Sequence, residues 1–591
     1  MNLIDDFFNN KDRDFDLNKS EYYLGKISSV SIGVASVQVE NMSLLRYRFN
    51  QQDVLRPNAI NYHVLIDSAA GTFFGKVINS YIGNNDNVHA AVINSNDDII
   101  YPNTQIQIIA LYNGKNFKLP GSLTVGIGDK VYISNAQAIE EYINSLEMNK
   151  KYGQIEFSSF DLNEKKSIPF KISVDNLFDH HFMIIGATNS GKSTSALAIL
   201  ARYHNLNGKF LIIDPTGEYE NSFSDNEIAI KLIGKTLFLN TANLTDDQWI
   251  SLFRPNDNSQ VIELLEAIKK MKFVHFFNSH KNQFKEDNIL LKYIDDDIFD
   301  CKGASLEEYK HMQSKWEDDN YVSEPFNILN LYKQIEKDSL KLKYNRDKYK
   351  DEYQFDSFTY GNNSWLISKV KYLSEKYGLK DIFLKTEHKA EKDTEVDDNS
   401  KNEEENNYED LNALLKEFQN NDRSLYIGLN NTNYSAIIGK LIVDYVSEFL
   451  LTHDMTDHPM VLFIDEVHRY ALEKDNQGEF NSPLIALSRE GRKNGVFLFL
   501  ATQSPKDVPA IVLNQMGTML IHRLTGEYEL KAISNFLNKA NLDQLPTLKS
   551  GQGILTSVNL IQTIVLNISA SKRKHNNQTP SLRRPNYKKI K

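Results

Sequence analysis

The sequence has a single cysteine, Cys301, and no apolar run that approaches the ~18 residues needed to cross a bilayer. One cysteine excludes an internal disulfide framework and any zinc site built from several cysteines. The first residues, MNLIDDFFNNKDRDFD, are acidic, whereas a signal peptide begins basic and then turns apolar. We therefore expect a cytoplasmic protein with no membrane association, in which Cys301 is a small buried residue.

The chain is also short of net positive charge, because 67 Lys and Arg residues stand against 78 Asp and Glu residues. The formal net charge of −11 excludes a surface broadly covered with phosphate-binding cations, but it allows a local basic channel. Acidic residues gather in the polar stretch 387–410, which predicts a solvated linker or insertion. The tail after Ser571 has eight Lys and Arg residues and no acid, so it either contacts DNA or a neighbouring subunit or is a solvated terminus.

The hydrophobic pattern changes twice along the 591 residues and predicts an α/β protein of several folding units. Short β-rich runs such as NYHVLIDS and GTFFGKVINSYI predict an amino-terminal β-barrel domain, which either docks a partner or is purely structural. Strands then alternate with helices, the rhythm of a parallel sheet, around a charged helical stretch. The predicted domains are the barrel at 1–155, an α/β core at 156–244 and 421–570, an inserted helical subdomain at 245–420 and a basic tail at 571–591.

A complete phosphate-binding motif, G-x-x-x-x-G-K-[ST], stands between an apolar strand and a helix. Its residues are Gly186, Ala187, Thr188, Asn189, Ser190, Gly191, Lys192 and Ser193, followed by Thr194. Glycines let the backbone turn tightly, so that N–H groups converge on a phosphate at the positive end of the helix. The motif predicts that ATP binds here, with Lys192 along the β- and γ-phosphates and the Ser193 hydroxyl on Mg²⁺.

A second set of polar residues follows the buried strands that the pattern predicts. Asp465 and Glu466 end the run MVLFIDE; we expect Asp465 to hold Mg²⁺ through water and Glu466 to act as the general base. Gln503 ends the next strand, where a side chain can read the γ-phosphate. Asp214 and Glu218, in LIIDPTGEY, are expected near the same nucleotide. Capping of a loop is an equal alternative for Gln503, Asp214 and Glu218.

The chain resembles the HerA branch of the HerA/FtsK superfamily of RecA-like motor ATPases. The resemblance is carried by GATNSGKST, IIDPTGEY, LFIDEVHRY, SREGRKNGVFLFLATQSPKDVP and IHRL, in family order. It implies a RecA-like core behind an amino-terminal barrel, and a homohexamer with nucleotide between subunits. In such rings a neighbour's arginine completes the site; Arg492 is the first candidate, Arg489 the second and Arg523 a weaker third. A structural ion pair, for example with Glu490, is the alternative.

The leading hypothesis is an ATP-hydrolysing, hexameric double-stranded DNA translocase or helicase. The resemblance implies a companion: a NurA-like nuclease in DNA end processing, or another nuclease or a sirtuin-like NAD-consuming effector in antiphage defence. An alternative is an ATP-gated scaffold ring that assembles and activates an effector with little translocation. A conjugation coupling or packaging motor is a third hypothesis, although such motors usually carry membrane-anchoring segments.

Overall fold

The computed structural model describes residues 3–8, 17–40, 42–49, 54–55, 57, 60–82, 101–149, 153–163, 166–295, 297–321, 323–376, 378–383, 409–429, 436–471 and 482–576. The chain forms two compact units. Unit 1 comprises Met1–Asn207, Thr502–Lys506 and Asn514–Lys572, and unit 2 comprises Gly208–Ala501, Asp507–Leu513 and Arg573–Lys591. Most of the predicted acidic segment and of the predicted basic tail lies outside the described residues.

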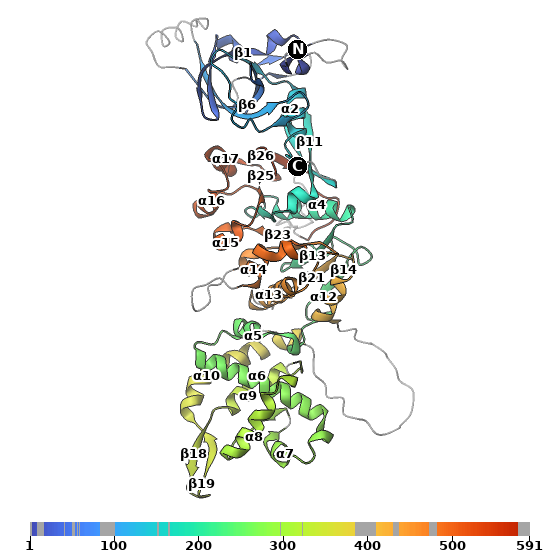
Figure 1. Ribbon diagram of the computed structural model, residues 1–591, viewed down its shortest axis with the longest axis vertical. Helices are drawn as coiled ribbons and strands as arrows, with labels where there is room; N and C mark the ends of the chain where they lie inside the picture. Colours follow the sequence, from blue (N-terminus) through green and yellow to red (C-terminus); the bar gives the residue numbers. More distant parts are fainter. Residues whose placement is uncertain are drawn as a thin grey trace, which may run out of the picture. The chain divides into compact units, whose positions relative to one another are not determined.

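Unit 1 begins with a closed β-barrel (Figure 1). Its strands are β1 (Tyr23–Ser31), β2 (Val34–Val39), β5 (His63–Ser68), β6 (Gly71–Tyr81), β7 (Asn103–Tyr112) and β9 (Lys130–Ile133). They are ordered β2-β1-β9-β5-β6-β7, and pairing of β2 with β7 closes the barrel. The interior is aromatic: the ring of Phe74 stacks on that of Tyr142, which lies on helix α2 (Ala136–Asn144), with 4.3 Å between centroids. The predicted amino-terminal barrel is confirmed.

The rest of unit 1 is a sheet that carries the phosphate loop. Its strands are β10 (Gln154–Asn163), β11 (Lys166–Ser173), β12 (Phe182–Ile185), β24 (Thr518–Ile521), β25 (Gln552–Ser557) and β26 (Ile564–Ile568), in the order β11-β10-β26-β25-β24-β12. Only β12 and β24 are parallel, and the other pairs are antiparallel. The hydrophobic pattern did not predict this antiparallel flank. Helix α4 (Lys192–Asn205) follows β12 and buries most of its residues.

Unit 2 contains the parallel strands that the pattern predicted. They are β13 (Lys209–Asp214), β14 (Ala229–Leu232), β21 (Leu425–Gly428), β22 (Met460–Ile464) and β23 (Val496–Thr502), in the order β23-β22-β13-β21-β14. Every residue of β13, β21 and β22 is buried, as expected for strands covered on both faces. The apolar helix α13 (Ala436–Thr452) precedes β22 in the chain. Together with the barrel, these strands confirm the predicted α/β class.

A helical subdomain is inserted between β14 and β21 (Figure 1). Its helices are α5 (Asp246–Phe253), α6 (Asn258–Ser279), α7 (Asn288–Tyr293), α8 (Leu306–Trp316), α9 (Leu331–Lys337), α10 (Ser357–Glu375) and α11 (Leu379–Ile382). Capping boxes at Thr245 and Ser305 begin α5 and α8. Cys301 is buried in the core of the subdomain, where burial raises the pKa of its thiol to about 12. No described helix is both long and apolar enough to cross a membrane.

One local prediction inside this insertion is wrong. The inserted stretch 245–420 is predicted to be helical, but α9 ends at Lys337 and the strand β18 (Leu340–Asn345) begins three residues later. That strand pairs with β19 (Lys350–Phe355) in an antiparallel hairpin. Packing decides against the helix, because Tyr353 of β19 stacks on Tyr309 of α8 with ring centroids 4.2 Å apart.

Candidate nucleotide-binding site

The phosphate loop leaves the buried strand β12 and ends at the first turn of α4. The Gly186 N–H donates to the Thr502 carbonyl at 3.2 Å, and the Ala187 N–H donates to the Arg523 carbonyl at 3.1 Å. On the other side, the Gly551 N–H donates to the Ser190 carbonyl at 3.0 Å. The loop is therefore held by backbone hydrogen bonds to segments more than 300 residues away in the chain.

Two glycines are required by this geometry. A Cβ on Gly186 would collide with the Ser190 hydroxyl and would lie 2.7 Å from Cβ of His522. Gly191 has φ 110°, a backbone conformation that side chains disfavour, and a Cβ there would lie 3.1 Å from the Gly551 nitrogen. The tight turn predicted from the motif is thus formed.

The loop has the donors that a triphosphate requires. Helix α4 has Gly191 as its N-cap, and its first backbone bond runs from the Ser195 N–H to the Gly191 carbonyl at 2.9 Å. The helix itself therefore supplies no acceptor for the N–H groups of Lys192, Ser193 and Thr194. These groups lie at the positive end of the helix dipole, where phosphate binds. A nucleoside triphosphate with Mg²⁺ fits the loop, with the Ser193 hydroxyl available to the ion.

His522, which belongs to the IHRL segment but was given no role from the sequence, supports the base of the loop. His522 is fully buried beside α4, and its Nε2 lies 2.9 Å from Oγ of Ser195. Its Nδ1 lies 2.7 Å from the carbonyl oxygen of Gln552. Burial lowers the pKa of His522 to about 4, with the charge of Lys192 acting in the same direction. The imidazole is therefore neutral at pH 7, and donates at Nδ1 while accepting from the Ser195 hydroxyl.

Gln503 lies at the loop, in the same unit. The Thr188 hydroxyl donates to Oε1 of Gln503 at 2.8 Å, and Thr188 itself is exposed. Gln503 directly follows β23, as the sequence indicated. The structure brings these two side chains together, and contact of Gln503 with a γ-phosphate stays a prediction.

The acidic pair lies at the carboxyl end of β22 in unit 2. Asp465 and Glu466 are both buried, and the Glu466 N–H donates to Oδ1 of Asp465 at 2.9 Å. Glu466 has φ 49°, in the left-handed region that costs a residue with a side chain about 1 kcal/mol or more. Its Oε2 lies 3.2 Å from Nδ1 of His468. Strained backbone of this kind concentrates at functional positions, which supports the role predicted for Glu466.

Asp214 ends the neighbouring strand β13, and its oxygens are occupied by its own loop. Oδ1 accepts from the Thr216 N–H and hydroxyl and from the Gly217 N–H, and Oδ2 accepts from the Tyr219 N–H and the Tyr426 hydroxyl, all within 3.0 Å. These bonds give Asp214 the loop-capping role that the sequence analysis names as its alternative. Glu218 is half-buried, and its backbone carbonyl accepts from the Asn576 N–H at 2.8 Å. Nucleotide contact by either carboxylate stays a prediction.

The candidate trans-acting arginines are exposed. Arg489 ends the helix α14 (Pro483–Glu490), and Arg492 lies in the turn that follows. Neither guanidinium makes an ion pair with any part of the chain that the structure describes, so the structural pairing with Glu490 is not formed there. The third candidate, Arg523, is exposed in unit 1, where its carbonyl accepts from Ala187.

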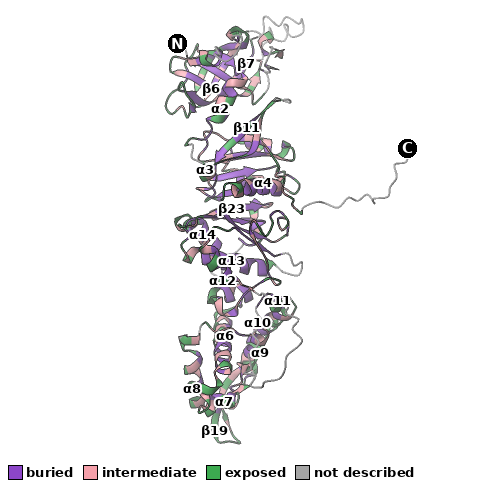
Figure 2. Cartoon of the chain, turned by 90° about the vertical axis from the view of Figure 1, so that its right-hand side faces the viewer, coloured by how far each residue is buried: buried purple, intermediate pink, exposed green. Residues whose placement is uncertain are grey.

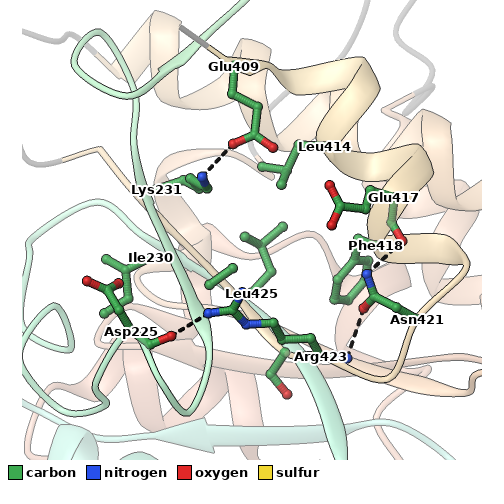
Figure 3. Close-up of a pocket in the computed structure, with 12 residues that line it drawn as sticks. Asp225, Ile230, Lys231, Glu409, Leu414, Glu417, Phe418, Asn421, Arg423 and Leu425 are labelled. Atoms are coloured by element: carbon green, nitrogen blue, oxygen red, sulfur yellow. Dashed lines mark hydrogen bonds and ion pairs between the residues drawn. The ribbon is translucent and has the colours of Figure 1, made fainter. Parts of the chain in front are cut away.

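A pocket of about 370 Å³ in unit 2 is separate from these residues (Figure 3). It lies at the amino ends of β14 and β21, whereas parallel sheets bind ligands at the carboxyl ends of their strands. Its cations are already engaged: Lys231 pairs with Glu409, and Arg423 donates to the carbonyl of Asp225 (Figure 3). The pocket is therefore no candidate for the nucleotide.

The phosphate loop at the start of α4, with an acidic pair at the carboxyl edge of a parallel sheet, defines a P-loop nucleoside triphosphatase. Residues 161–443 match the family described as the central domain of the helicase HerA. This match and the curated HerA relatives support a HerA-type ATPase of the HerA/FtsK superfamily.

Individual relatives are distant. A probable helicase of Methanocaldococcus jannaschii is 23% identical over 411 residues, 68% of each chain. A DNA double-strand break repair helicase HerA of Saccharolobus solfataricus is 23% identical over 394 residues, 66% of this chain and 64% of that protein. Among solved structures, VirB4 of Thermoanaerobacter pseudethanolicus is similar with a TM-score of 0.46 and 17% identity, covering 72% of this chain and 98% of that one. The chain thus spans about two thirds of the length of these curated relatives.

Proposed function

We propose that this protein is an ATP-driven motor that moves along double-stranded DNA as a homohexameric ring. The observation that carries the proposal is the phosphate loop, whose glycine turns and first helical turn form a triphosphate cradle. The HerA relatives bear the name of DNA double-strand break repair helicases, which supports DNA as the track. A ring also concentrates a few cations per subunit on one channel, so a chain of net charge −11 can still grip phosphates.

In the proposed reaction the backbone N–H groups at the start of α4 and the Lys192 ammonium bind the β- and γ-phosphates. Ser193 and Asp465 would hold Mg²⁺, and the ion would disperse the negative charge of the phosphates. Glu466 accepts a proton from the water whose oxygen attacks the γ-phosphorus. The bond from that phosphorus to the β–γ bridging oxygen breaks and leaves ADP and inorganic phosphate. Arg492 of a neighbouring subunit stabilises the charge that develops, an effect of about 10³ to 10⁵ in rate.

The ring works beside a companion protein in this proposal. The companion is a NurA-like or other nuclease, or a sirtuin-like NAD-consuming effector, in DNA end processing or antiphage defence in the cytoplasm. The support for a companion is the resemblance of this chain to the HerA branch, whose central domain matches residues 161–443. In this proposal the motor carries its companion along DNA, so its movement decides where on the DNA the companion acts.

The test is the steady-state ATPase rate of the purified full-length ring, measured with and without linear duplex DNA. We expect DNA to stimulate the ATPase rate strongly in wild type and not in Glu466→Gln. The variant still binds the phosphates of ATP, but it lacks the carboxylate that accepts a proton from the attacking water. Native mass spectrometry in the presence of ATP checks the hexamer. Hydrolysis that DNA does not change would overturn the motor and favour the scaffold ring.

A further inference from the structure

The β18–β19 hairpin carries a concentration of positive charge that is unusual for this chain. Residues 340–355, LKLKYNRDKYKDEYQF, contain five Lys and Arg residues and three acids, so the hairpin is net positive although the whole chain has a net charge of −11. The hairpin extends from the helical subdomain (Figure 1), and residues 346–351 around its turn are all exposed (Figure 2). Local charge of this kind, set in an acidic protein, indicates a surface for a polyanion.

One face of the hairpin is anchored to the helical subdomain. Its register pairs Leu342 with Tyr353 and Lys341 with Gln354, so these two pairs point to opposite faces. Tyr353 stacks on Tyr309 of α8 with centroids 4.2 Å apart, which fixes its face to the subdomain. Lys341 lies on the opposite face, where it is exposed, and the anchored face fixes its position.

Two of the five cations are already neutralised within the subdomain. Lys343 pairs with Asp356 at 2.8 Å, and Lys348 pairs with Glu352 at 3.1 Å. The other three are exposed and form no ion pair with the described chain: Lys341, Arg346 and Lys350. These three cations are therefore available to bind an anionic partner.

Aromatic rings accompany these cations at the turn. Tyr349 is 82% exposed and Tyr344 is 58% exposed, so both rings lie largely in water. Tyr349 also has φ 53°, a left-handed conformation that is uncommon for an aromatic residue. Exposed rings beside unpaired cations are the combination by which proteins bind unpaired nucleotides, with rings stacking on bases and cations on phosphates.

We propose that the β18–β19 hairpin is a second DNA contact, which binds unpaired strand at the end or fork of a duplex. Lys341, Arg346 and Lys350 contact phosphates, and Tyr349 stacks on a base. An acidic protein surface would use the same cations but would gain little from the exposed rings, so the rings favour nucleic acid. The inference deepens the proposed function, because it assigns the strand-engaging element of a DNA motor to the insertion.

The test is fluorescence anisotropy of the full-length protein with three labelled probes: a single strand of 30 nucleotides, a blunt duplex and a duplex with a single-stranded overhang. One variant removes the three unpaired cations, Lys341→Ala with Arg346→Ala and Lys350→Ala. The matched control removes three exposed cations that make no ion pair with the described residues elsewhere in the same subdomain, Lys269→Ala with Lys281→Ala and Lys310→Ala. Both variants change the net charge equally.

The hairpin variant should bind the single strand and the overhang about tenfold more weakly, and its salt slope should fall by about 2, since each single-strand phosphate contact contributes about 0.7. The control variant should match wild type. Tyr349→Ala should lower the affinity for the single strand roughly 5- to 100-fold and leave the affinity for the blunt duplex unchanged. Tyr349→Phe should bind the single strand as wild type does, because it keeps the aromatic ring.

The outcomes separate this inference from the proposed function. Wild-type affinity and salt slope in the hairpin variant would overturn the hairpin contact, while duplex-stimulated ATPase would leave the motor in place. Equal weakening in the control variant would likewise overturn it, because the effect would then be one of net charge. Loss confined to the cations, with no effect of Tyr349→Ala, would overturn base stacking and with it the assignment to unpaired strand. No DNA stimulation of wild-type ATPase would overturn the motor itself.

Discussion

Replacing His522 with Phe tests whether its buried imidazole stabilises the phosphate-loop region, where it joins Ser195 of α4 to Gln552 of β25. The substitution keeps an aromatic ring but removes both ring nitrogens. The Gln552 carbonyl and the Ser195 hydroxyl, now 2.7 and 2.9 Å from those nitrogens, would each lose a buried partner. A buried polar group left without its hydrogen bond costs about 1–3 kcal/mol, so the loss of both bonds should lower local stability by about 2–6 kcal/mol.

The same imidazole predicts a pH dependence. His522 has a pKa of about 4 in the folded protein against an ordinary 6.5, so between pH 6.5 and 4 the unfolded chain binds a proton that the folded chain does not. The free energy of opening therefore rises with pH through this window and falls again on acidification. From pH 7 to 5 the loss is about 2 kcal/mol, at 1.36 kcal/mol per pH unit below 6.5. This contribution is absent in His522→Phe.

Hydrogen exchange measured by mass spectrometry suits this test. All three tryptophans, Trp249, Trp316 and Trp365, lie in the helical subdomain of unit 2, so their fluorescence does not report on unit 1. Exchange of peptides from 186–205 and 552–557 gives the free energy of local opening at the loop, and tryptophan fluorescence confirms that unit 2 is intact. Ser195→Ala, which removes one of the two bonds, should show a smaller loss.

The free energy of local opening should differ between wild type and His522→Phe by about 2 kcal/mol less at pH 5 than at pH 7. Comparing the two proteins at each pH cancels the contribution of other titrating groups, because both proteins contain those groups. Equal protection of the loop in wild type and variant at pH 7 would refute the structural role. A difference that stays constant with pH would refute the lowered pKa.

Three further predictions concern the ATPase and the insertion. Lys192→Ala should abolish binding of a fluorescent ATP analogue without changing the hexamer, and normal turnover would contradict the phosphate-loop assignment. Arg492→Ala should regain ATPase activity in rings mixed with Glu466→Gln subunits, since the two lesions lie on opposite sides of an interface; no rescue at any mixing ratio would count against a trans role. Asp338→Asn should destabilise the helical subdomain by about 3–5 kcal/mol in urea unfolding followed by tryptophan fluorescence, because buried Lys270, now 2.9 Å away, keeps its charge with only a longer contact of 3.9 Å to Glu266. An unchanged midpoint would contradict that prediction.

The sequence predicted those parts of the site that local patterns determine. The motif from Gly186 to Ser193 folds as the expected turn, because its glycines and its flanking strand and helix are all local features. Asp465 and Glu466 follow a buried strand for the same reason. Whether these carboxylates and the loop act on one nucleotide stays a prediction.

Other features depend on contacts that no local pattern reveals. His522 lies 327 positions from Ser195 in the chain, and Gly551 is equally remote from the loop it contacts. The strand β18 was predicted as helix because Leu and Lys suit both structures, and stacking of Tyr353 on Tyr309 decides between them. The antiparallel strands β10 and β11 were missed because their pattern is weak beside that of the parallel strands.

The bond from Gly551 to the Ser190 carbonyl has a consequence for synthesis on the ribosome. Chains emerge amino terminus first, so the phosphate loop leaves the exit tunnel long before the segment that supports it. A stalled nascent chain that ends before residue 550 should therefore not retain ATP, although its loop sequence is complete. The nucleotide site would therefore mature only after residue 551 has left the exit tunnel, so shorter nascent chains would not hold nucleotide.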